Sequence, residues 1–104
     1  MTRVQVFNEI KNVVHSQLGD ADLMLFGSRA KGFHSDESDY DILIITSNTF
    51  RPDQKIPIRT SIRKELLKKG IRSDILIQSK SEIARKKKLP GHFIRNIMKD
   101  SIML

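Results

Sequence analysis

Hydrophobic residues recur along the chain with two different spacings, which predict alternating helices and strands. Between Val4 and Leu18 the apolar positions lie three or four residues apart, as on one face of an amphipathic helix. Short continuous apolar runs, in contrast, are typical of buried strands. These patterns predict helices over residues 4–18, 58–69, 81–89 and 93–98, and strands over residues 23–26, 40–46 and 71–78.

The order of these elements indicates the fold class. A short helical turn at residues 29–31 separates the first two strands, and helices flank the third. Residues 40–46 are rich in β-branched side chains and apolar on both faces, which favours the middle of a sheet. The 104 residues fit one domain, residues 1–104. We therefore expect an α/β (α+β) fold: a small mixed β-sheet with helices packed on it.

Composition excludes several classes of protein. The chain has no Cys, so a disulfide scaffold and a thiolate zinc site are excluded. The longest apolar run, Ile42–Ile45, has four residues, which is too short to span a membrane. Residues 1–5 lack the apolar stretch of a secretory signal. The expected location is the cytoplasm.

Charge is distributed unevenly along the chain. The net charge is +7, but residues 1–50 carry −3 and residues 51–104 carry +10. This asymmetry indicates an anionic partner for the second half, or well-solvated Lys-rich helices. The basic run Arg85–Lys88 contains no aromatic residue, which is typical of a solvated helix end. Direct binding of nucleic acid is therefore not expected.

Three acidic residues are candidates for chemistry. Asp39 and Asp41 are one residue apart at the start of a predicted strand, so their side chains share a face. Carboxylates this close repel each other unless a cation lies between them, and paired oxygen ligands suit Mg²⁺. Asp74 interrupts an apolar strand that we expect inside the sheet, where an unpaired acid is costly. The alternatives are a hydrophilic turn for the first two acids and a salt bridge to Arg72 or another basic residue for Asp74.

A second candidate lies between the first strand and the helical turn. Gly27 and Ser28 follow the apolar run 23–26. Free backbone N–H groups and a hydroxyl at such a point can bind an anion, and Gly lets a phosphate approach the main chain. An ordinary strand-to-helix turn is the alternative.

Together these residues resemble the signature of a known superfamily. The pattern resembles the nucleotidyltransferase signature of the DNA polymerase β superfamily. It consists of the segment LFGSRAKG (residues 25–32) and Asp-Tyr-Asp at 39–41, with ten residues between Ser28 and Asp39. Asp74 matches the third carboxylate on the following strand, although Ser73 stands where an apolar residue is usual. In size and in its Gly-Ser segment the chain resembles the minimal nucleotidyltransferases (MNT). The similarity extends over nearly the whole chain.

The resemblance implies a nucleotidyltransferase fold and a metal site. Asp39 and Asp41 would hold two Mg²⁺ ions that bridge the triphosphate of the nucleotide. Asp74 would share the ion nearer the acceptor and help to activate its hydroxyl. The implied reaction is in-line transfer of a nucleotidyl group with pyrophosphate leaving.

The resemblance also implies nucleotide-binding residues and a partner. Gly27 and Ser28 would bind the β- and γ-phosphates, with Arg29 or Lys31 adding positive charge. Proteins of the MNT group, which this chain resembles, transfer AMP from ATP to a tyrosine of a HEPN-domain toxin and act as its antitoxin. The expected function of this chain is the same.

Two other functions stay open at this point. An MNT fold could neutralise its partner by binding alone, without catalysis. A nucleotidyltransferase of this kind could also use a small-molecule acceptor such as an aminoglycoside, although the chain is short for that. The apolar side of the segment that ends at Leu104 has few partners in the chain, which suggests a homo-oligomer.

Overall fold

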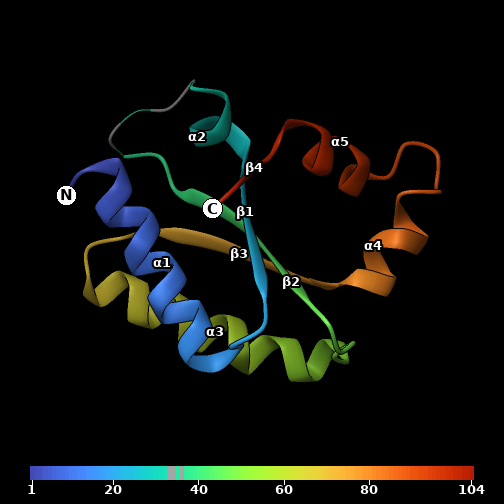
Figure 1. Ribbon diagram of the computed structural model, residues 1–104, viewed down its shortest axis with the longest axis horizontal. Helices are drawn as coiled ribbons and strands as arrows, with labels where there is room; N and C mark the ends of the chain where they lie inside the picture. The colour runs from blue at the N-terminus through green and yellow to red at the C-terminus, as the bar shows by residue number, and fades with distance from the viewer. Residues whose placement is uncertain (33–34, 36) are drawn as a thin grey trace.

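The fold is a four-stranded sheet between two groups of helices (Figure 1). The computed structural model describes residues 1–32, 35 and 37–104, so part of the loop predicted after Gly32 lies outside the described residues. The helices are α1 (Arg3–Gln17), α2 (Gly27–Lys31), α3 (Pro52–Lys68), α4 (Lys80–Lys86) and α5 (Phe93–Asp100); the strands are β1 (Asp22–Phe26), β2 (Tyr40–Thr46), β3 (Ser73–Ser79) and β4 (Ile102–Met103).

The sheet is mixed, with the order β3-β2-β1-β4. Strand β1 runs antiparallel to both β2 and β4, whereas β2 and β3 are parallel. The expected small mixed sheet is confirmed, and β2 lies inside it as predicted. Strand β3, however, lies at an edge of the sheet rather than inside it.

Each face of the sheet packs against its own helices. In Figure 1, α1 and α3 lie together on one side of the sheet, while α4 and α5 lie on the other. Alternation along β2 explains this, because Ile42 and Ile44 point into one core and Leu43 and Ile45 into the other. The α1/α3 core is the larger and includes the fully buried Ile10, Ile62 and Leu66.

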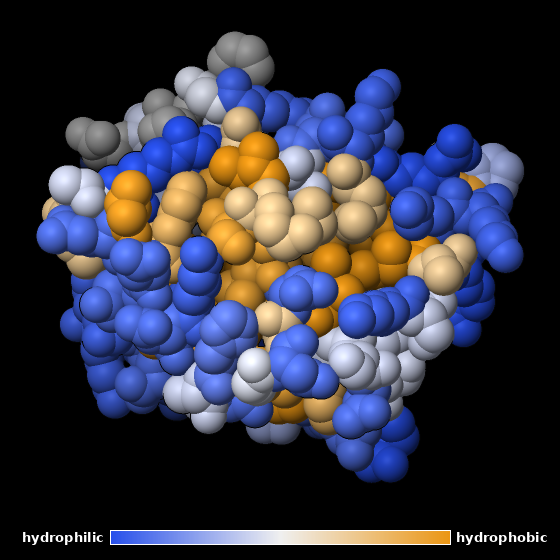
Figure 2. Space-filling view, viewed as in Figure 1, coloured by the Kyte–Doolittle hydropathy of each residue, from blue (hydrophilic) through white to orange (hydrophobic). Residues whose placement is uncertain are grey.

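The second core is small and leaves apolar residues at the surface. It contains Ile83 of α4 and Ile94 of α5, packed on β1 and β2. Figure 2 shows apolar side chains at the centre of one face, over the region of β1 and β4 and within a hydrophilic rim. Met103 of β4 and Phe93 of α5 are exposed. No helix in the described ranges is long and apolar enough to cross a membrane.

Polar contacts hold helix α4 to the end of β3 and to α3. Its N-cap Ser79 accepts a hydrogen bond from the Glu82 N–H, and the Glu82 carboxylate accepts one from the Ser79 N–H. The same carboxylate pairs with Lys55 of α3 at 2.9 Å, and both side chains are largely buried. Burial alone would raise the pKa of Glu82, but these hydrogen bonds and the Lys55 charge outweigh it and hold the pKa below its ordinary value.

Helix α3 and strand β4 differ most from the predicted elements. Helix α3 begins at Pro52, earlier than the predicted residue 58. Pro suits the first helical turn, where its missing N–H would be unbonded in any case, and Gln54 caps the Arg51 N–H. Strand β4 was not predicted, because a pair of residues is too short to show a period and depends on its pairing with Met24 and Leu25.

A pair of neighbouring leucines in α3 tests the assignment of the larger core. Leu66 is fully buried, whereas Leu67 is 59% exposed. We expect Leu66→Ala to lower the free energy of unfolding by about 2–5 kcal/mol through lost burial and a cavity. Leu67→Ala should change it by no more than about 0.5 kcal/mol. Urea denaturation of both variants measures the difference, and equal losses would contradict this packing of α3.

Candidate active site

The parallel pairing of β2 with β3 places two of the predicted acids opposite each other. In this register Asp41 is the direct partner of Asp74, and neighbouring strands lie about 4.8 Å apart. Both residues are near the beginning of their strands and belong to the sheet face that carries Leu43 and Leu76, the face covered by α4 and α5. The two carboxylates therefore project from the same side of the sheet.

In the described part of the chain, no cation is paired with these two carboxylates. Burial, followed by the charges of Asp74 and Asp39, raises the pKa of Asp41 above its ordinary value of 3.8. Neither the Asp41 nor the Asp74 side chain forms a hydrogen bond or ion pair with any part of the chain that the structure describes. A cation bound between the two would remove the repulsion. Their oxygen donors suit a hard divalent ion such as Mg²⁺.

Asp74 is tolerated for a different reason from the one expected. The expected cost of this acid assumed an inner strand, but β3 is an edge strand and Asp74 is exposed. Water therefore solvates its carboxylate. The alternative salt bridge between Asp74 and Arg72 is not formed either, since Arg72 pairs with another residue.

The partner of Arg72 is the third predicted acid, Asp39. The Arg72 Nε lies 3.6 Å from Asp39 Oδ1, and both side chains are about half exposed. Arg72 Nη2 also donates a hydrogen bond to the Glu37 carbonyl oxygen. In the described ranges no three acidic, His or Cys side chains stand close enough to hold one metal ion. Asp39 lies at the same end of the sheet as the other two acids, but its carboxylate is paired with Arg72.

The contact between Arg72 and Asp39 was not predicted from the sequence, because it follows from the register of β2 and β3. Tyr40 pairs with Ser73 across the parallel strands, so one step back along both strands sets Asp39 beside Arg72. This step can be taken only once the register is known.

Gly27 is required at the end of β1 for two reasons. Its φ of 70° lies in the left-handed region that favours Gly. A Cβ here would also collide with the Asp41 carboxylate, coming within 2.9 Å of its Cγ. The main chain at the start of α2 is thus in contact with Asp41. Among the described residues no side chain caps this end of α2, so its first N–H groups can face an anion.

The two predicted cations of α2 are held in different ways. Arg29 lies over the Tyr40 ring at 3.9 Å, and its Nε donates a hydrogen bond to the Ser38 carbonyl oxygen at 2.9 Å. Lys31 pairs loosely with Asp100 of α5 at 3.6 Å, and both are about half exposed. Lys31 can therefore move toward a ligand at little cost, whereas Arg29 is restrained beside Tyr40.

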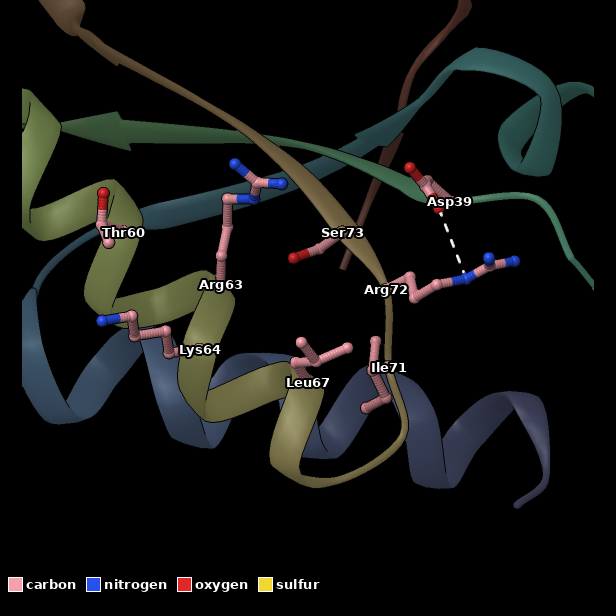
Figure 3. Close-up of a pocket in the computed structure, with 8 residues that line it drawn as sticks. All are labelled: Asp39, Thr60, Arg63, Lys64, Leu67, Ile71, Arg72 and Ser73. Carbon is pink, nitrogen blue, oxygen red and sulfur yellow. Dashed lines mark ion pairs between the residues drawn. The ribbon is translucent and has the colours of Figure 1, made fainter.

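A pocket of about 470 Å³ lies next to this site, between α3 and β3 (Figure 3). We call it the α3–β3 pocket. Leu67 and Ile71 form its apolar side. Its polar lining consists of Asp39, Thr60, Arg63, Lys64, Arg72 and Ser73. Asp39 is the one member of the acidic trio that belongs to it.

The sequence and the fold both match known nucleotidyltransferases. The model of the family described as "Nucleotidyltransferase domain" matches residues 7–104. The chain is 35% identical over 82 residues to "Putative protein adenylyltransferase MJ0604" of Methanocaldococcus jannaschii, covering 79% of this chain and 75% of that protein.

Two solved structures share the fold. One, described as a "putative minimal nucleotidyltransferase", has a TM-score of 0.61 and 18% identity over 99% of this chain and 97% of the other. A "putative nucleotidyltransferase" from Sulfolobus solfataricus has a TM-score of 0.50 and 24% identity over 96% of this chain and 77% of the other. With the family match over residues 7–104, the Gly27 turn and the paired acids, the chain belongs to the nucleotidyltransferase domain family and is a transferase.

Proposed function

We propose that this enzyme transfers AMP from ATP to a tyrosine hydroxyl of a partner protein in a Mg²⁺-dependent reaction. The observation that carries the proposal is the Asp41–Asp74 pair, whose charge has no cationic partner in the described part of the chain. The M. jannaschii relative, named as a protein adenylyltransferase, supports ATP as donor and a protein as acceptor.

The acids of the site would hold Mg²⁺ and position the acceptor. Bound Mg²⁺ supplies charge stabilisation for the attacking and leaving oxygens. Asp41 of β2 lies close to Gly27 at the start of α2 and opposite Asp74 of β3. It is therefore suited to the ions that contact the nucleotide. Asp74, exposed at the edge of the sheet, is suited to orient the incoming hydroxyl and accept its proton.

Asp39 would join the other two acids by leaving Arg72. Their ion pair is long, at 3.6 Å, and about half exposed, so breaking it costs little. The three carboxylates would then hold the two Mg²⁺ ions expected for this reaction. In this proposal the pair with Arg72 is the resting position of the Asp39 carboxylate.

The main chain at the start of α2 would bind the β- and γ-phosphates. Gly27 and Ser28 present the first N–H groups of that helix, and Gly27 is already in contact with Asp41. Lys31 would add positive charge after release from Asp100, and Arg29 is restrained beside Tyr40 at the other side of the turn.

The proposed partner is a HEPN-domain toxin, with this enzyme as its antitoxin. The apolar area over β1 and β4 in Figure 2 is the surface on which such a partner or a second copy of the chain would bind. Neutralisation by binding alone and transfer to a small molecule are the competing functions, and the first experiment below distinguishes neutralisation by binding alone from transfer of AMP.

Transfer of AMP is tested by mass spectrometry of the partner after incubation with enzyme, ATP and Mg²⁺. We expect one or more added AMP groups on a tyrosine. Asp41→Asn and Asp74→Asn should each lower the rate on the order of a hundredfold or more, because charge stabilisation in the transition state is lost. Asp22→Asn is the matched control, since Asp22 is an exposed acid on β1 away from the pair, and it should keep the rate. Neutralisation of the toxin without added mass would refute the proposed reaction.

A comparison of two glycines tests the contact between the α2 turn and Asp41. Gly27 and Gly32 both have a positive φ, but only at Gly27 would a Cβ meet other atoms within 4 Å. Each Ala substitution should destabilise the fold by about 1–3 kcal/mol through backbone strain. Only Gly27→Ala should also abolish transfer, because it displaces the Asp41 carboxylate. Equal activity of the two variants would contradict this contact. The readouts are the thermal midpoint and the initial transfer rate.

The stability of the protein should depend on the charge of Asp41 and on Mg²⁺. Because the folded-state pKa of Asp41 is raised, the folded protein holds this proton more tightly than the unfolded chain, so stability falls as the pH rises above 3.8. Asp41→Asn should therefore raise Tm at pH 7, and the gain should vanish below pH 3.8. Mg²⁺ should raise Tm of the unmodified protein at pH 7 but not that of the variant. A Tm of Asp41→Asn below that of the unmodified protein at pH 7 would contradict the repulsion.

A further inference from the structure

We propose that the α3–β3 pocket is a second ligand site, which binds a small molecule carrying a phosphate group. This site lies on the other side of the sheet from the Asp41–Asp74 pair, and Asp39 at the edge is the one acid of the proposed metal site that lines it. Ser73 and Ile71 of the pocket belong to the sheet side that packs on α1 and α3, whereas Asp41 and Asp74 project from the opposite side. The proposal does not depend on the reaction proposed above.

The charges in the pocket indicate an anion. Arg63, Lys64 and Arg72 line it, against the single carboxylate of Asp39. Neither the Arg63 nor the Lys64 side chain forms a hydrogen bond or ion pair with any residue in the described ranges. In contrast, two other lysines at the end of α3 have carboxylate partners within 3.0 Å, Lys68 with Glu65 and Lys69 with Glu9. Arg63 and Lys64 are thus cations of α3 that line the pocket without a carboxylate partner among the described residues.

A buried hydroxyl provides an independent sign of a ligand. Ser73 is only 7% exposed, and its Oγ has no hydrogen-bond partner among the residues that the structure describes. Figure 3 shows the Ser73 hydroxyl pointing from β3 toward α3, and the Arg63 side chain extending from α3 toward β3. An unsatisfied buried hydroxyl costs stability, and an oxygen of a bound phosphate would satisfy it. Ser73 and the cations would then contact the same group.

The size and the apolar side of the pocket limit the ligand. A volume of about 470 Å³ falls within the range of small-molecule sites. Leu67 and Ile71 can contact an apolar or ring portion, while Arg63, Arg72 and Ser73 contact the phosphate. The three acceptor oxygens of a phosphate match several donors at once, and Arg binds it through two parallel hydrogen bonds. A phosphate monoester with a small ring fits this lining best.

The binding test uses phenyl phosphate as the probe, measured by isothermal titration calorimetry in the presence of EDTA. We expect saturable binding that is at least about tenfold weaker in Arg63→Ala, through loss of a charge-assisted hydrogen bond. Arg59→Ala is the matched control, because Arg59 lies one turn earlier on α3 and is not part of the pocket lining. It should leave the affinity within about twofold. Asp41→Asn should also keep the affinity, which separates this site from the catalytic one.

Ser73→Ala adds a readout that general electrostatic attraction would not change. It should weaken phenyl phosphate binding and at the same time raise Tm of the free protein, because it removes a buried hydroxyl without a partner. Benzoate, which carries the same ring with a carboxylate, should bind more weakly than phenyl phosphate. The proposal is wrong if phenyl phosphate shows no saturable binding up to about 10 mM. Equal losses in Arg63→Ala and Arg59→Ala, or tighter binding of benzoate, would also overturn it.

Discussion

The parallel pairing of β2 with β3 is the constraint on which both the fold and the site depend. The register that sets Ile42 beside Ile75 and Ile44 beside Ile77 closes the larger core under α1 and α3. The same register sets Asp41 beside Asp74, because the side chains alternate between the faces of the sheet. The hydrophobic core thus forces two carboxylates together. Burial of the apolar side chains outweighs the repulsion, and the charge remains for a cation to neutralise.

The acidic end of the sheet is partly neutralised by the basic second half of the chain. Of the three predicted acids, Asp39 is paired with Arg72, while Asp41 and Asp74 are left without a cation in the described residues. Arg72 also lines the α3–β3 pocket, so one side chain belongs to both regions. The net charge of +7 therefore combines an acidic site with basic side chains that surround it.

Most of the elements could be predicted from the sequence because their signals are local. The period of α1, the apolar run of β2 and the Gly27-Ser28 turn all lie within a few residues. The exceptions depend on distant partners. Strand β4 exists only through its pairing with β1, and the early start of α3 is supported by the Lys55–Glu82 ion pair with α4. The inner position expected for β3 was wrong, since β3 lies at an edge of the sheet. An edge strand with helices on both of its faces can be as apolar as a central strand, so apolar content does not distinguish the two.

The sequence by itself determined the types of residue in the site and their order: a glycine turn after a strand, two acids at the start of the next, and a third acid on the strand that follows. Only the tertiary structure decided which of them meet. It brought Asp74 opposite Asp41, turned Asp39 to Arg72, and left Ser73 buried beside Arg63 in a pocket. The physical reason is that helix and turn signals are carried by neighbouring residues. The register between two strands is chosen by the packing of whole faces, and no single segment contains it.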